Sequence, residues 1–217
     1  MKHTRSLVPI FLCALASGCV LNAISGSGNI VTEPRSVSGF SAISLNGTGR
    51  LLIERTGTES LTVTADDNLL PEIRTEVRGD RLEIGLKDFA TNIRPSTDII
   101  YKVTVKDLRN LGVSGSGTAD AKGLQTGRLK IDISGSGKVA ADGTADDLEI
   151  DISGSGAFRG DSLRSKRAEI DISGSGSAVV AVAEKLDVDV SGSGSVSYIG
   201  DPQVKKNISG SGSVRKQ

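Results

Sequence analysis

The residues with most potential for chemistry are carboxylates that recur at matched places in the second half of the chain. Each belongs to a short run in which aliphatic and polar residues alternate, such as Leu148-Glu149-Ile150-Asp151-Ile152. One set of matched acids is Asp132, Asp151, Asp171 and Asp189, and a second set, two residues earlier in each run, is Glu149, Glu169 and Asp187. If the runs are strands in parallel register, the acids form two adjacent columns.

Stacked like charges repel by about 1 kcal/mol per pair even at the dielectric of water, so the repulsion in these columns must be offset. In the structural interpretation, Lys130 and Lys205 close the ends of one column, while Lys166, Arg167 and Lys185 lean over the edges and solvent screens the rest. A sharper interpretation is a weak divalent-cation surface on the four aspartates, because hard cations favour clustered carboxylate oxygens. Glycoside cleavage by paired carboxylates is disfavoured, since an exposed, repetitive column gives no acid a reason for a raised pKa.

Other catalytic arrangements are missing from the sequence. The single histidine, His3, lies in the segment expected to be removed, which excludes Ser-His-Asp, Cys-His and His-based metal sites in the mature chain. No Gly-rich stretch matches a dinucleotide fingerprint or a phosphate loop. Lys and Arg balance Asp and Glu at 26 each, so nucleic acid is not an expected partner. We expect no cofactor and no metal-dependent activity.

The tripeptide Arg78-Gly79-Asp80 matches the integrin-recognition sequence. It stands between two strand-like runs, Ile73 to Val77 and Leu82 to Leu86, where a Gly-Asp turn is expected for a hairpin in any case. We therefore interpret it as a turn.

The elements that position these residues are set by the tetrapeptide Ser-Gly-Ser-Gly, which occurs seven times. The copies begin at Ser25, Ser114, Ser134, Ser153, Ser173, Ser191 and Ser209, and the last six are 18–20 residues apart. Apolar residues occupy matched alternate positions before and after each copy. A unit of this length with two inward faces cannot hide its own apolar side, so it must stack on its neighbours.

The repeat predicts an all-β fold: a right-handed parallel β-helix, or solenoid, with coils of about 18–20 residues and Gly-Ser-Gly turns. The turn glycines supply positive φ angles, and the serines between them could hydrogen-bond along the stack. These glycines are Gly115, Gly117, Gly135, Gly137, Gly154, Gly156, Gly174, Gly176, Gly192, Gly194, Gly210 and Gly212. A β-sandwich of hairpins is the alternative, but hairpin partners need not share one sequence at matched positions.

The N-terminus reads as an export signal, with Lys2 and Arg5 before the apolar segment Leu7 to Ala16. Leu15-Ala16-Ser17-Gly18-Cys19 resembles the lipobox of bacterial lipoproteins, which implies that Cys19 is lipidated; ordinary cleavage after Ala16 is the alternative. We expect a signal peptide at 1–18, a lipidated tether at 19–30 and one β-helical domain at 31–217. Within that domain, 31–113 would form longer, decorated coils and 114–217 the regular repeats.

Several segments resemble the head GIN domain family of proposed autotransporter adhesins. They are Gly28-Asn29-Ile30-Val31, Ser38-Gly39-Phe40, the middle segment from Ala65 to Pro71, and the ending Tyr198-Ile199-Gly200-Asp201-Pro202 followed by the last Ser-Gly-Ser-Gly copy. The resemblance implies a right-handed β-helix of pectin-lyase shape and a role in cell adhesion. It assigns no catalytic residues, so none is carried over.

Together these observations predict a non-enzymatic, lipid-anchored protein of the cell envelope, with outer-membrane sorting, that presents a β-helical binding surface. Its partners would be the membrane, through Cys19, and a surface ligand that is a glycan or a protein. Two alternatives stay open: a carbohydrate-active enzyme that works through carboxylates, and a structural envelope component. The sequence leaves the oligomeric state undetermined.

Overall fold

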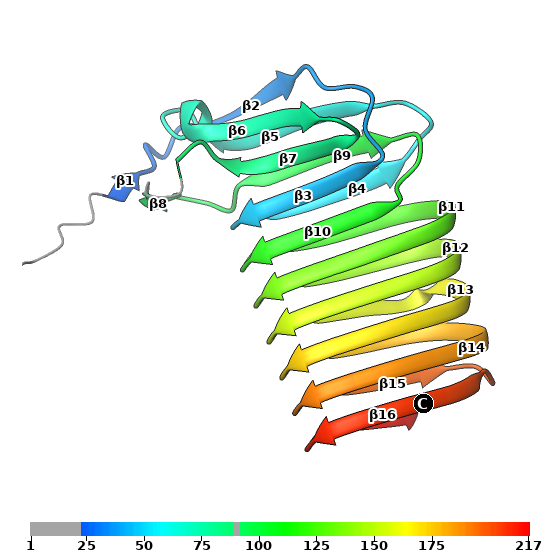
Figure 1. Ribbon diagram of the computed structural model, residues 1–217. Coiled ribbons are helices and arrows are strands. Elements are labelled where there is room, and N and C mark those ends of the chain that lie inside the picture. Colours follow the sequence, from blue (N-terminus) through cyan, green and yellow to red (C-terminus); the bar gives the residue numbers. More distant parts are fainter. Residues whose placement is uncertain (1–22, 89–91) are drawn as a thin grey trace, which may run out of the picture.

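The computed structural model describes residues 23–88 and 92–217, which form a tall stack of coils with a broader cap at one end (Figure 1). Strands account for nearly all regular structure, and the only helical element of the described residues is the 3₁₀ turn η1 (Leu70–Glu72). The strands of the stack are β3 (Ala42–Gly47), β4 (Arg50–Arg55), β10 (Asn110–Gly115), β11 (Thr118–Gly135), β12 (Lys138–Gly154), β13 (Ala157–Gly174), β14 (Ser177–Gly192), β15 (Ser195–Ile199), β16 (Gln203–Gly210) and β17 (Ser213–Lys216).

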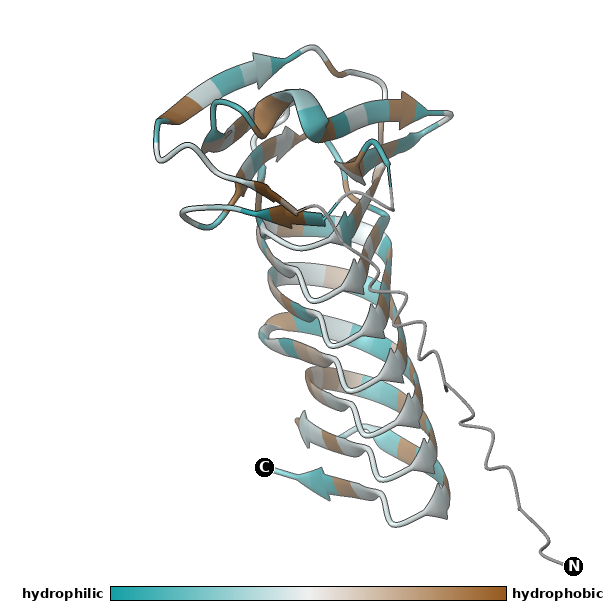
Figure 2. Cartoon of the chain, turned by 90° about the vertical axis from the view of Figure 1, so that its left-hand side faces the viewer, coloured by the Kyte–Doolittle hydropathy of each residue, from teal (hydrophilic) through white to brown (hydrophobic). Residues whose placement is uncertain are grey.

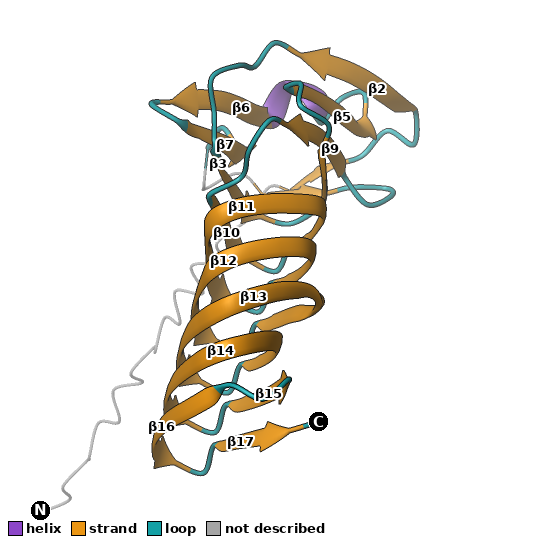
Figure 3. Ribbon diagram, turned by 90° about the vertical axis from the view of Figure 1, so that its right-hand side faces the viewer, coloured by secondary structure: helices purple, strands orange, loops and turns teal. Residues whose placement is uncertain are grey.

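Each coil crosses two sheets. In the long strands β11 to β14 the first half lies in one sheet and the second half in the other, with register shifts between them where the chain bends (Figure 3). We name the sheets by their place relative to the Ser-Gly-Ser-Gly turn. The pre-turn sheet contains β3, β10, the second halves of β11 to β14, and β16; the post-turn sheet contains β4, the first halves of β11 to β14, β15 and β17.

All pairings between successive coils are parallel, and within each sheet equivalent residues pair with one another. Ile131 faces Ile150, which faces Ile170, while in the post-turn sheet Val139 faces Phe158. The chain follows a right-handed helical path from the cap to the last coil (Figure 1). These features confirm the predicted right-handed β-solenoid and exclude the sandwich of hairpins, whose partners would run antiparallel.

The core is a thin layer of aliphatic side chains between the two sheets. Inward positions of both sheets are buried, and bands of apolar residues alternate with polar ones along each strand (Figure 2). Phe158 and Tyr101 are the largest fully buried side chains. Because each inward residue packs on its equivalent in the next coil, the core grows by one layer with each repeat.

The Ser-Gly-Ser-Gly turns stack along one edge, as Figure 2 shows, and backbone hydrogen bonds join them. The N–H of Ser136 donates to the carbonyl of Gly115 at 2.9 Å, and the N–H of Ser155 donates to that of Gly135 at 2.8 Å. The predicted hydrogen bonds between serine hydroxyls do not occur in the part of the chain that the structure describes. Main-chain groups therefore hold the turns, and the hydroxyls are left facing solvent.

The two glycines of each turn are needed for different reasons, which corrects our expectation that both adopt positive φ. The first glycine has φ between 97° and 123°, at Gly115, Gly135, Gly154, Gly174, Gly192 and Gly210. The second glycine does not. A Cβ there would lie 2.4–2.6 Å from an aliphatic carbon of the core, at Gly117, Gly137, Gly156, Gly176, Gly194 and Gly212. The first position needs the backbone angle as well as space beside the neighbouring turn, and the second needs space alone.

Within the region 31–113, only β3, β4 and β10 belong to the stack; the other strands form a cap, and not the longer coils that the sequence suggested. The strands β2 (Ile30–Arg35), β5 (Ser60–Asp66) and β9 (Ile100–Val105) extend the post-turn sheet, with antiparallel pairs β2–β5 and β5–β9. The hairpin of β6 (Ile73–Arg78) and β7 (Arg81–Leu86) extends the pre-turn sheet above β3. Reversals of chain direction end the stacking here, so the first coil is covered by strands that do not repeat.

The first Ser-Gly-Ser-Gly copy is not a corner of the solenoid. It follows β1 (Ala23–Ser25), which pairs with β8 (Asn92–Arg94), so part of the expected tether is a strand. The degenerate copy Asn46-Gly47-Thr48-Gly49 forms the first corner instead, and the N–H of Ser116 donates to the carbonyl of Gly47 at 3.0 Å.

The copy that begins at Ser25 is held by the buried carboxylate of Asp66. This carboxylate accepts hydrogen bonds from the N–H of Gly28 at 2.8 Å, the N–H of Ser96 at 3.0 Å and the hydroxyl of Ser96 at 2.5 Å. A Cβ on Gly26 would lie 2.4 Å from Asp66 Cγ. Here the glycine permits close approach to a carboxylate, and it does not build a turn between sheets.

None of the helical structure in the described residues is long and apolar enough to cross a bilayer.

Candidate binding face

The candidate binding face is the outer surface of the pre-turn sheet. Side chains that alternate with the buried aliphatic residues must point outward, and these outward positions carry the predicted acids. The register confirms both columns. In the first, Glu149 faces Glu169, which faces Asp187; the second runs through Asp132, Asp151, Asp171 and Asp189. We call this surface the acidic face.

Lys130 closes the upper end of the first column and also reaches the second. Its Nζ lies 2.6 Å from Glu149 Oε1, 2.5 Å from Asp151 Oδ2 and 3.5 Å from Asp132 Oδ1. These carboxylates raise the pKa of Lys130, with the hydrogen bond to Asp151 as the largest cause. Lys130 therefore closes this end as predicted, and it pairs with acids of both columns.

The lower end of the acidic face is closed less tightly. Lys205 faces Asp187 in the register, but their charged atoms are 3.9 Å apart. The second column ends with Asn207, whose Nδ2 donates to Asp189 Oδ1 at 2.7 Å. An amide thus replaces a cation at this end.

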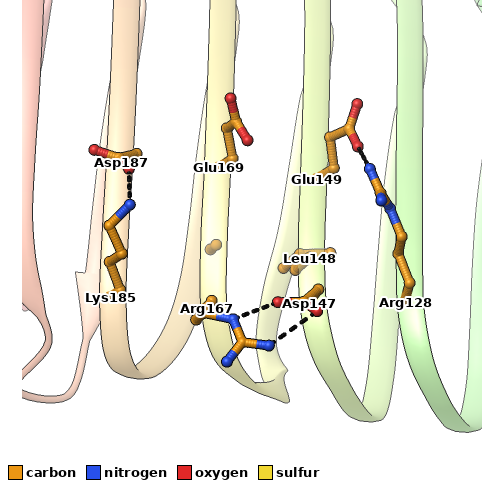
Figure 4. Close-up of a pocket in the computed structure, with 9 residues that line it drawn as sticks. Arg128, Asp147, Leu148, Glu149, Arg167, Glu169, Lys185 and Asp187 are labelled. Atoms are coloured by element: carbon orange, nitrogen blue, oxygen red, sulfur yellow. Dashed lines mark hydrogen bonds and ion pairs between the residues drawn. The ribbon is translucent and has the colours of Figure 1, made fainter.

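A flanking row of three cations and one acid runs beside the acidic face at the bend of the coils. Its members Arg128, Asp147, Arg167 and Lys185 face one another in the register. Arg167 binds Asp147 through two hydrogen bonds of 2.6 and 3.0 Å, and Arg128 donates to Glu149 at 2.6 Å (Figure 4). A shallow groove of about 320 Å³ lies between this row and the first acidic column.

Ion pairs lower the pKa of several acids on this side. The hydrogen bonds from Lys130 and then Arg128 lower the pKa of Glu149. Arg167 does the same for Asp147, and Lys185, which contacts Asp187 directly, lowers the pKa of that acid. Of the edge cations predicted from sequence, Lys166 pairs with Asp146 at 2.8 Å.

The centre of the acidic face is not neutralised. Glu169 and Asp171 have no cation or hydrogen-bond donor within reach among the described residues, and Figure 4 shows Glu169 without a partner beside the paired acids. Burial, followed by the charges of Asp151 and Asp189, raises the pKa of Asp171. Our sequence-based expectation that no acid in the columns has a raised pKa was wrong, because Asp171 is partly desolvated and lies between two charged acids.

The acids of this face do not form a defined metal site in the described residues. Within residues 23–88 and 92–217, no group of three or more His, Cys, Asp or Glu residues is arranged to hold a metal ion. The weak cation surface on Asp132, Asp151, Asp171 and Asp189 stays a prediction. The buried aromatic side chains of the core, Phe40, Tyr101 and Phe158, cannot serve as platforms for sugar rings.

The tripeptide Arg78-Gly79-Asp80 is the turn of the hairpin β6–β7. Gly79 has φ 63°, and Arg78 pairs with Glu76 at 3.0 Å. The carboxylate of Asp80 accepts a hydrogen bond from the hydroxyl of Ser41 at 3.2 Å. Both charged side chains have partners within the protein, so the geometry agrees with the turn interpretation.

Two predicted features, the lipidation site Cys19 and the histidine His3, lie outside the described residues. Sequence reasoning also missed two features that the structure shows. The first is that Lys130 contacts acids of both columns. An alignment of Lys130 with the matched acids of the next coil could have revealed this. The second is Asp66, which binds segments about 30 and 38 residues away and carries no local signal.

Comparisons with known proteins agree with this architecture. Residues 39–202 match the family described as "Putative auto-transporter adhesin, head GIN domain". A putative adhesin from Bacteroides fragilis NCTC 9343 is 21% identical with a TM-score of 0.73, and the match covers 90% of this chain and 100% of that one. Two structures from Parabacteroides distasonis ATCC 8503 are also similar to this chain, and each match covers 90% of this chain and 100% of the other. One, described as a putative lipid binding protein, is 27% identical with a TM-score of 0.61. The other, described as a putative adhesin, is 23% identical with a TM-score of 0.58.

A comparison with curated proteins found no match. The family match extends from the loop between β2 and β3 to the residue before β16, and it includes the acidic face as far as Asp189. The chain belongs to the head GIN domain family.

Proposed function

We propose that this protein is a non-enzymatic adhesin of the cell envelope, anchored in the outer membrane through a lipid on Cys19, and that it binds a cationic partner surface with its acidic face. Membership of an adhesin-like family supports the general role. The observation that carries the assignment to one surface is the uncompensated pair Glu169 and Asp171 at the centre of that face.

The central acids are unfavourable for the fold. Parallel register places Asp171 directly between Asp151 and Asp189, at strand spacings of about 4.8 Å. Like charges that directly oppose one another destabilise a sheet, and a neutral residue would fit these exposed outward positions equally well. Residues that oppose stability in an otherwise consistent repeat are typical of functional surfaces.

A flat solenoid face suits adhesion because its spacing is rigid. The acids stand on strands fixed on both sides by neighbouring coils, so their positions do not depend on loops. A partner that carries repeated cations could contact several acids at once, and such multivalent contact strengthens weak individual pairs.

The binding assignment is tested with the triple variant Glu169→Gln, Asp171→Asn, Asp189→Asn. The matched control removes three exposed acids elsewhere, Glu54→Gln, Asp98→Asn and Asp161→Asn, so that both proteins have the same net charge. Each labelled protein is applied to immobilised extracellular-matrix proteins, to a glycan array and to polylysine. We expect the first variant to lose binding and the control to keep it; equal binding by both proteins would refute the assignment to the acidic face.

The anchor is tested separately. Metabolic labelling with a fatty acid should mark the wild-type protein and not Cys19→Ser, and protease treatment of intact cells should degrade a surface-exposed domain. Labelling of Cys19→Ser would contradict lipidation at this cysteine. A domain that survives the protease would contradict adhesion to other cells. Release of reducing or unsaturated sugars from polysaccharides would contradict the non-enzymatic assignment.

A further inference from the structure

The last coil leaves one edge of the solenoid open. β16 pairs with β14 and β17 pairs with β15, and no strand of the described residues pairs with their other edges. An open sheet edge presents unpaired N–H and C=O groups to any other strand. At the opposite end the cap covers the same kind of edge, so the two ends of the stack differ (Figure 1).

This edge has most of what a stacking partner would need. Val204, Ile208 and Val214 continue the buried apolar columns of the coils above, because they face Leu186, Val190 and Val196 in the register. Val204 is 38% exposed, whereas its equivalents in the coils above are buried. A further coil of the same pattern would bury these side chains.

The central inward column does not continue in this way. It runs through Ile131, Ile150, Ile170 and Val188, all buried, and then reaches Lys206. In the post-turn sheet, Lys216 likewise follows Tyr198 at an inward position, where it pairs with Asp201. Lys206 is exposed and has no ion pair among the described residues.

We propose that Lys206 prevents a second copy of this chain from stacking end to end on this edge. Two copies that met here about a two-fold axis would bury both Lys206 ammonium groups between aliphatic columns, without a carboxylate to pair with them. The last 15 residues contain Lys205, Lys206, Arg215 and Lys216 and no acid, so like charges would also face one another. Inward-pointing charges on an edge strand are a known means of blocking such association.

The experiment uses the mature protein purified from cells and compares the variant Lys206→Ile with the variant Lys205→Ile. Both variants exchange one lysine of β16 for isoleucine, but position 206 points inward and position 205 points outward. We expect Lys206→Ile to dimerise at least about tenfold more tightly than wild type in sedimentation equilibrium. Lys205→Ile should behave as wild type.

Equal association of both variants would show a general effect of charge or hydrophobicity and would overturn the proposal. So would a Lys206→Ile protein that remains in the wild-type state. Lys206→Met, whose unbranched side chain demands little adjustment, must associate as well, and Lys206→Gln must not. Hydrogen exchange locates the contact: amides of β16 should gain protection in associated Lys206→Ile, and protection of the same amides in wild type at equal concentration would also overturn the proposal.

Discussion

The regular coils and the cap cover apolar sheet edges in opposite ways. Between β10 and β16 the same positions recur, and each coil is covered by an equivalent coil with the same turn and the same inward columns. In the cap, antiparallel strands extend the two sheets, and the contacts that hold them occur once, such as those of Asp66 with Ser96 and Gly28. The regular coils are therefore held together by repeated, equivalent contacts, whereas the cap is held together by contacts that occur only once.

The difference determines where a local defect is felt. In a solenoid the stability is roughly the sum of the coils and their nearest-neighbour interfaces, so a defect in a central coil weakens two interfaces. A defect at the periphery of the cap releases only the segment that depends on it. Substitutions in the two regions should accordingly produce global and local unfolding respectively.

The largest expected effect comes from the central turn glycines. Gly154→Ala combines a φ of 113° with a Cβ placed 2.6 Å from the carbonyl oxygen of Gly135, and neither can relax without moving the backbone of the neighbouring coil. Gly156→Ala lacks the positive φ but places its Cβ 2.4 Å from Ile133 Cγ2. We expect losses in the free energy of unfolding of about 3–4 kcal/mol for the first and about 2–3 kcal/mol for the second, measured by urea denaturation.

Two other glycines separate the causes. Gly123 has φ 67° with open space around its Cβ position, so Gly123→Ala reports backbone strain alone and should cost about 1 kcal/mol. Gly127 has neither constraint, and Gly127→Ala should stay within about 0.5 kcal/mol of wild type. A Gly156→Ala protein as stable as Gly127→Ala would disprove the distinct roles of the two turn glycines.

The next effect is local, at the junction of β1 and the cap. Asp66→Ala removes the acceptor of three hydrogen bonds and should release residues 23–28, seen as fast hydrogen exchange there, while the coils keep their protection. Hydrogen bonds from Ser96 lower the pKa of Asp66. A lowered pKa in the folded state gives stability above the usual value of 3.8 that is lost as the pH falls further, so wild type should release the same segment only in strong acid. Loss of protection throughout β11 to β14 in Asp66→Ala would contradict this local role.

The same contrast explains how far the sequence could predict the structure. In the coils, alignment of Ile131 with Ile150 and Ile170 predicts register, burial and the outward acids together, because one pattern is repeated six times with the same physical requirements. The position of Lys130 opposite Glu149 follows from the same alignment. The sequence pattern was thus enough to predict the structure wherever a residue packs against the equivalent residues of the adjacent coils.

Prediction failed wherever the partner is remote or the reason is steric. The strands β5, β6, β7 and β9 were predictable as strands, but their antiparallel order above the first coil depends on contacts between distant segments. The identical tetrapeptide at Ser25 and Ser114 forms a loop around Asp66 in one place and a solenoid corner in the other. The reason for Gly156, the closeness of Ile133, is visible only when two coils are packed together.

A smaller effect tests how the acidic face is neutralised within the regular coils. Lys130→Met removes a cation that contacts three acids, Glu149, Asp151 and Asp132. This substitution should lower the free energy of unfolding by about 1 kcal/mol at neutral pH. Lys130 is the first cause of the lowered pKa of Glu149, so this contribution exists above the usual value of 4.5 and disappears as the pH falls below it. Lys138→Met, at an outward position of the post-turn sheet, should have almost no effect. Equal losses in both variants, or a loss that persists in acid, would mean that the ion pairs do not support the face.

The smallest effect has the opposite sign and connects stability with function. The raised pKa of Asp171 means that its charged form is less stable in the folded than in the unfolded protein, a cost that is present at neutral pH and absent once the carboxylate is protonated in both states. Asp171→Asn should therefore raise the free energy of unfolding by about 0.5 kcal/mol at pH 7, with no gain well below 3.8. Asp161→Asn is the control, because this exposed acid lies outside the acidic face and its loss should bring no gain. If Asp171→Asn also weakens binding while it stabilises the fold, the acid is retained for the partner; a gain that persists in acid would instead indicate better packing of the amide and remove the electrostatic argument for this face.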